Sequence, residues 1–84
     1  MRPKLKEGIV VKRVKSDFYA FDRANREMYE LNEISFEILR MCNGERSIES
    51  IAEELAEKSQ SSFERAYDYT REFIKEIENI GMLK

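Results

Sequence analysis

The stretch Leu31-Asn32-Glu33-Ile34 decides the fold, because a β-rich segment ends there and an α-rich segment begins. Asn32 is suited to be a helix N-cap, since its side-chain oxygen can accept a hydrogen bond from the backbone N–H two or three residues later. Leu31 and Phe36 flank this cap at the spacing of a hydrophobic staple, which fixes the angle at which the chain enters the helix. We therefore expect a strand that runs into a helix with almost no loop, leaving a free backbone edge beside a groove.

Upstream of this junction, the sequence predicts a three-stranded antiparallel meander. The first strand is rich in β-branched residues and the second in aromatic residues, both of which favour pleated structure. Asp and Asn residues between the second and third strands supply turn chemistry. Residues 1–7 are polar and are expected to be loose. The predicted strands are residues 9–14, 18–21 and 26–31.

Downstream of the junction, apolar residues at helical spacing predict a first and a second helix. The first extends over residues 33–42 and is expected to end at Gly44 in the left-handed conformation. The second begins after the N-cap Ser47 and is broken by residues 59–62. The apolar stripe predicted for the first helix consists of Ile34, Ile38, Met41 and Cys42, with Phe36 and Leu39 beside it.

The third predicted helix is long. Ser61 and Glu64 fit a capping box at its start, and Gly81 is a C-terminal stop after Ile80. Met82 and Leu83 are expected to fold back over the core. The predicted stripe of this helix consists of Phe63, Ala66, Tyr67, Thr70, Phe73, Ile74, Ile77 and Ile80.

Together these segments predict one α+β domain over residues 1–84, with the order βββααα and a winged-helix-like arrangement. The net charge of −2 conceals an asymmetry, because residues 1–26 carry +5 and residues 27–84 carry −7. Cys42 is the only cysteine, so no internal disulfide can form, as expected in a reducing cytoplasm. No apolar run approaches the length of a membrane span, and the N-terminus has no secretory signal pattern.

The composition argues against catalysis. The chain contains no histidine, which removes the commonest general base and metal ligand. A single cysteine without histidine makes neither a nucleophile pair nor a zinc site. The three glycines are isolated and form no phosphate-binding loop. We therefore expect no catalytic residues, no cofactor and no metal site.

Three kinds of binding protein remain. The first is a peptide-binding domain that accepts an extended segment along the edge of the third strand. The second is a winged-helix DNA-binding regulator, in which the second and third helices form the helix-turn-helix. The third helix carries five acidic and three basic residues, and this excess of negative charge opposes contact with DNA phosphates. The third is a structural subunit whose strand edge pairs with its own copy, as a weak homodimer.

Several segments in order resemble the PqqD family. They are Leu31-Asn32, Ile38-Leu39, the run from Cys42 to Leu55, Phe73-Ile74, Ile77, and Gly81-Met82-Leu83. The family pattern is an LN pair, an apolar helix, a C-D-G-x-R-T-like turn, an I-x-x-x-L helix and F-L-x-x-L-x-x-x-G-L-L. Each segment is unspecific alone, but their order and spacing are fairly specific.

The resemblance implies a RiPP recognition element, a non-catalytic peptide chaperone of natural-product biosynthesis. Such a domain binds the leader region of a ribosomally made precursor peptide and presents it to a modifying enzyme, often a radical SAM protein. In the family the leader adds to the third strand and lies against the third helix. Carried over to this chain, the peptide-facing residues are Glu27, Met28, Tyr29, Glu30 and Leu31 on the strand, and Arg65, Tyr69, Phe73 and Glu76 on the helix.

This chain departs from the family pattern at three positions. Asn43 and Ser47 stand where the family turn often has Asp and Thr, and both replacements keep the turn and cap chemistry. Tyr69 stands where family members often have an acidic residue, so the leader preference of this chain is open.

Overall fold

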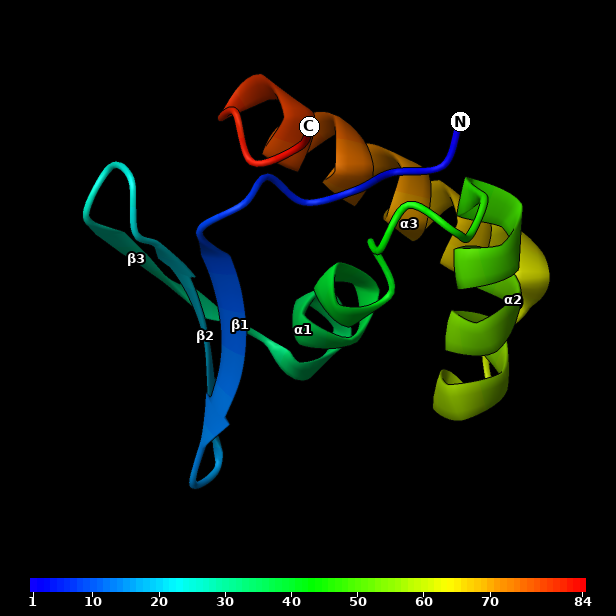
Figure 1. Cartoon of the computed structure of the whole chain (residues 1–84). Helices are drawn as coiled ribbons and strands as arrows, with labels where there is room; N and C mark the ends of the chain where they lie inside the picture. Colours follow the sequence, from blue (N-terminus) through cyan, green and yellow to red (C-terminus); the bar gives the residue numbers. More distant parts are fainter.

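The computed structural model describes every residue from Met1 to Lys84. Three strands are followed by three helices (Figure 1), which confirms the predicted α+β fold with βββααα order. The sheet is antiparallel and has the strand order β1-β2-β3, so β1 and β3 are its two edges. The elements are β1 Ile9–Val14, β2 Asp17–Asp22, β3 Glu27–Leu31, α1 Glu33–Arg40, α2 Ile48–Ser59 and α3 Phe63–Asn79.

All three helices lie on one side of the sheet, with α1 between the sheet and α2 (Figure 1). The strand register places Val11, Ala20 and Tyr29 in one row across the sheet. Ala20 is fully buried, so this row belongs to the inner face, toward the helices. Successive side chains alternate between faces, and Met28 therefore points to the outer face, where it is 61% exposed.

The hydrophobic core joins the three helices to the inner face of the sheet. It is formed by Ala20, Ile38, Leu39, Met41, Cys42, Ile51, Ala52, Leu55, Ala66, Ile74, Ile77, Met82 and Leu83. Three predicted core residues are instead exposed, namely Ile34, Phe63 and Ile80. They lie at the ends of α1 and α3, where no neighbouring element covers the apolar stripe.

Helix starts follow the predicted caps in two cases and differ in the third. Asn32 accepts from the backbone N–H of Ser35, and Ser47 accepts from that of Ser50. The start of α3 is capped by Ser62 rather than by the predicted Ser61. The reason is the preceding helix, because Ser61 still donates its backbone N–H to the carbonyl of Ala56 and so belongs to the end of α2.

The first helix is shorter than predicted. It ends at Arg40, with Met41 as its C-cap, so Gly44 is not its terminator. Gly44 instead shapes the loop before α2, with a φ of 83°. The N-terminal segment crosses this loop, and a Cβ at Gly44 would lie only 3.1 Å from the Lys4 side chain. This close approach is a second reason for glycine at position 44.

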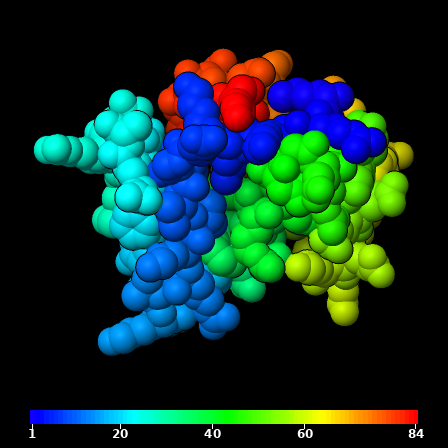
Figure 2. Space-filling model, viewed as in Figure 1, coloured from blue at the N-terminus to red at the C-terminus, as the bar shows by residue number.

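The N-terminal segment, predicted to be loose, is fixed by backbone hydrogen bonds. Leu5 donates to the carbonyl of Cys42 at 3.1 Å, and Lys6 donates to that of Met82 at 2.9 Å. In Figure 2 this segment crosses between the loop that follows α1 and the C-terminus. The prediction failed because polar composition does not reveal backbone pairing between the two ends of the chain, which is a tertiary contact.

The end of α3 is a Schellman motif, as the predicted stop at Gly81 implies. Gly81 has a φ of 82° and donates to the carbonyl of Glu78, and Met82 donates to that of Ile77. This turn directs Met82 and Leu83 into the core, where both are buried. The expectation that they fold back over the core is confirmed. None of the three helices has the length and apolar character that crossing a membrane requires.

Candidate functional site

The free edge of β3 is the first component of the site. Its neighbour in the sheet is β2, and no strand pairs with its other side. The two isolated β-bridges of the chain, Lys4 with Asn43 and Leu5 with Leu83, involve the termini and leave this edge open. Along an edge strand, alternate residues direct their backbone N–H and C=O groups outward, where they can pair with a further strand.

A groove between β3 and α3 is the second component. Its volume is about 440 Å³. Its lining is mainly apolar and comes from β3, α1, α3 and the C-terminal turn. The lining residues are Tyr29, Glu30, Leu31, Leu39, Phe73, Glu76, Ile77, Asn79, Ile80 and Met82.

The floor and the rim of this groove differ in character. Leu39, Ile77 and Met82 are buried core residues and form the floor. At the rim, Ile80 is 52% exposed, although it is a large aliphatic residue. An apolar groove with a few polar groups at its border is typical of a ligand site, and an extended edge beside it suits a peptide.

Tyr29 connects the edge strand to the groove. Its ring is half-buried against the core, and its hydroxyl donates to Oε2 of Glu27 at 2.5 Å. This hydrogen bond is the main reason that the pKa of Tyr29 lies above its usual range. The alternation of the strand places both side chains on the inner face, so Glu27 fixes the position of the Tyr29 ring.

Tyr69 connects α3 to the strand–helix junction. The Asn32 amide donates to the Tyr69 hydroxyl at 3.5 Å. A depression of about 120 Å³ lined by Tyr69, Glu72, Phe73 and Glu76 adjoins the groove, with which it shares Phe73 and Glu76. The groove therefore continues along α3 toward Tyr69.

The structure brings together most of the residues predicted to face a peptide. Five line the groove, namely Tyr29, Glu30, Leu31, Phe73 and Glu76. Tyr69 lies in the adjoining depression, and Glu27 holds Tyr29. Two lie elsewhere: Met28 is on the outer face of the sheet, and Arg65 lines a separate depression on the other side of Tyr69.

Sequence reasoning missed five lining residues, Leu39, Ile77, Asn79, Ile80 and Met82. Ile77 and Ile80 were assigned to the core stripe, and Ile80 lies beyond the last turn of α3, where the core ends. The only local signal was the Gly81 stop, which indicates that the chain reverses beside Ile80.

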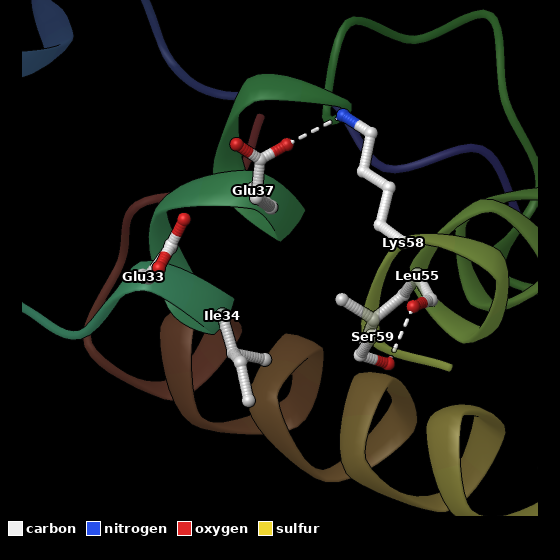
Figure 3. A pocket seen from close by; sticks show the side chains of 6 residues that line it. All are labelled: Glu33, Ile34, Glu37, Leu55, Lys58 and Ser59. Atoms are coloured by element: carbon white, nitrogen blue, oxygen red, sulfur yellow. Dashed lines mark hydrogen bonds and ion pairs between the residues drawn. The ribbon is translucent and has the colours of Figure 1, made fainter. Parts of the chain in front are cut away.

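A second depression lies between α1 and α2 (Figure 3) and has a volume of about 230 Å³. Three of its lining residues, Glu37, Lys58 and Ser59, already have hydrogen-bond partners. Lys58 donates to Oε2 of Glu37 at 2.8 Å, and Ser59 donates to the carbonyl of Leu55 at 2.7 Å. The hydrogen bond from Lys58 is the main reason that the pKa of Glu37 is below its usual range. The Lys58–Glu37 contact joins α2 to α1, whereas the Ser59–Leu55 bond lies within α2.

Cys42 is not placed for nucleophilic chemistry. It is buried, and desolvation raises its pKa to about 12. The thiolate is the reactive form of cysteine, so the side chain acts as a small core residue, as predicted.

Comparison with known proteins decides the family. The family model for PqqD, described as coenzyme PQQ synthesis protein D, matches residues 17–83. The chain belongs to the PqqD family. The match covers β2, β3 and all three helices, so both walls of the groove lie within the PqqD region. No curated protein matches the chain.

Two solved structures share the fold. One, described as lasso peptide synthetase B1 complexed with the leader peptide, has a TM-score of 0.83 at 17% identity and covers 100% of this chain and 99% of its own. The other, TbiB1 in complex with the TbiA(beta) leader peptide, has a TM-score of 0.81 at 12% identity. It covers 96% of this chain and 94% of its own.

Proposed function

We propose that this protein is a non-catalytic leader-peptide-binding domain, a RiPP recognition element that presents a ribosomally made precursor peptide to a modifying enzyme. The observation that carries the proposal is the unpaired edge of β3 beside an apolar groove. Membership of the PqqD family supports it, as do two structures of the same fold whose descriptions name a leader peptide.

In the proposed complex, the leader extends the sheet as a fourth strand. Backbone hydrogen bonds to β3 give affinity that depends little on sequence, and side-chain pockets give selectivity. Every second side chain of the added strand points to the inner face, toward Phe73, Ile77 and Met82 in the groove. These positions of the leader are therefore expected to be apolar.

The modifying enzyme is proposed to be a radical SAM protein, as the family resemblance implies. A domain that holds the leader and also contacts the enzyme raises the effective concentration of the core peptide at the active site. This proposal predicts that the enzyme modifies its precursor faster when the domain is present, and that a precursor without its leader gains nothing from the domain.

The test begins with a displayed library of random peptides about ten residues long, the upper range of an ordinary strand. Selected peptides are titrated into the ¹⁵N-labelled protein. We expect slower amide hydrogen exchange along Glu27–Leu31 and shift changes on α3 around Phe73 and Ile80.

The opposite edge of the same sheet is the internal control. β1 is also an edge, but the groove does not adjoin it. Amides of Ile9–Val14 should therefore keep their exchange rates when peptide binds. Failure to select any binder, or binders that protect β1 and leave β3 unchanged, would contradict the proposed function.

A further inference from the structure

Negative charge surrounds the groove, which suggests the chemistry of the peptide. Glu30 lies on its β3 side and Glu76 on its α3 side, and Glu72 lines the adjoining depression. No Lys or Arg is among the residues that line either space. The charged residues that line these two spaces are therefore all carboxylates.

These three carboxylates have no partner within the chain. The ion pairs of the protein join Arg40 and Lys58 to Glu37, and Arg46 to Glu54, all away from the groove. Glu72 and Glu76 are four residues apart on α3, a spacing at which like charges repel. A cation supplied by a ligand would relieve this repulsion.

Outward and inward side chains of an added strand would meet different carboxylates. Glu30 points to the outer face of the sheet, because it is in register with Tyr19 and Lys12. An outward side chain of the added strand would lie directly opposite Glu30, where opposite charges attract. Inward side chains would meet the apolar floor, with Glu76 and Glu72 at its border.

A second copy of this chain is a poor occupant of the same edge. Its β3 carries Glu27 and Glu30, so pairing two β3 strands would bring carboxylates of both copies into the same ladder. Like charges across a ladder are destabilising.

We propose that the peptide bound in this groove is basic and amphipathic, with apolar residues at alternate positions facing α3 and Lys or Arg residues opposite Glu30 and beside Glu72 and Glu76. This inference rests on the proposed function and specifies the class of leader that it accepts. Such pairs are solvent-exposed, so they favour recognition of one peptide over another more than they add affinity.

The test compares peptides selected by the natural protein and by two charge variants. The natural protein should enrich peptides with more Lys and Arg than Asp and Glu. The double variant Glu30→Lys/Glu76→Lys should lose or reverse this bias, and the control Glu53→Lys, on an exposed position of α2, should keep it. A basic peptide selected on the natural protein should bind the double variant about three- to tenfold more weakly.

Each outcome separates this inference from the proposed function. Binders that protect β3 but show no charge bias, or an acidic bias, would overturn the basic-peptide inference while leaving the peptide-binding function intact. Equal loss of affinity in Glu53→Lys would also overturn it, because the effect would then be one of net charge. Unchanged affinity of the basic peptide for the double variant would likewise overturn the basic-peptide inference.

Discussion

Asn32 links the start of α1 to α3 through both atoms of its amide group. Its Oδ1 accepts from the backbone N–H of Ser35 at 2.7 Å, and its Nδ2 donates to the Tyr69 hydroxyl at 3.5 Å. One residue therefore caps a helix and positions the end of the edge strand relative to the helix that forms the opposite wall of the groove.

Two substitutions at Asn32 should distinguish the contribution of the helix cap from that of the hydrogen bond to Tyr69. Asn32→Ala removes the cap and should lower the free energy of unfolding by about 1 kcal/mol. Asn32→Asp retains an acceptor for Ser35 and a second oxygen that can accept from Tyr69, so stability should change by less than about 0.5 kcal/mol. Urea denaturation of both variants measures the difference. Equal losses in Asn32→Ala and Asn32→Asp would show that the donated amide hydrogen, rather than the cap, is important.

Thr70 is fully buried on α3, and its hydroxyl has no hydrogen-bond partner. Burying an unpaired polar group is costly, so Thr70→Val, which has nearly the same shape, should stabilise the protein by about 1 kcal/mol. Thr70→Ser is the matched control, because it keeps the hydroxyl and loses a buried methyl group, and should destabilise by about 1 kcal/mol. A less stable Thr70→Val protein in thermal denaturation would mean that the hydroxyl is bonded in solution.

The Glu37–Lys58 pair should make stability depend on pH. The folded state lowers the pKa of Glu37 from its ordinary value of 4.5, mainly through the hydrogen bond from Lys58. A lowered carboxyl pKa means that the pair stabilises the fold above about pH 4.5, and that this contribution disappears as the pH falls through the folded-state pKa. Lys58→Met should therefore cost about 0.5 kcal/mol near neutral pH and progressively less in acid.

Denaturation at several pH values measures this effect. The control is Lys75→Met, since Lys75 is exposed on α3 and forms no ion pair. A loss in Lys58→Met that is constant from neutral pH to pH 3 would contradict the electrostatic explanation and indicate lost packing of the lysine stem.

Ile80 offers a test of the groove with little risk to the fold. Its side chain is 52% exposed at the rim, so Ile80→Ser should leave the unfolding midpoint nearly unchanged. If a bound peptide covers this side chain, its loss should weaken peptide binding about fivefold. Val14→Ser is the control, because Val14 is similarly exposed, at 47%, but lies on the outer face of β1. Equal affinities of the two variants in calorimetry would place the peptide away from Ile80.

The sequence alone determined the elements whose signals are local. The cap at Asn32, the cap at Ser47 and the stop at Gly81 were all found correctly, because each acts within a few residues of its own backbone. The alternation of side chains along β3 is equally local, and it places Tyr29 and Met28 on opposite faces of the sheet. The order of these signals along the chain was enough to predict the fold class and the family.

Tertiary structure decided what depends on neighbours distant in sequence. Whether Ile34 and Ile80 belong to the core depended on which elements cover the helix ends, and periodicity carries no such information. Leu5 and Lys6 were fixed by backbone groups of Cys42, in the middle of the chain, and of Met82, near its far end. The groove itself is a space left between β3 and α3, so no segment of sequence encodes it alone.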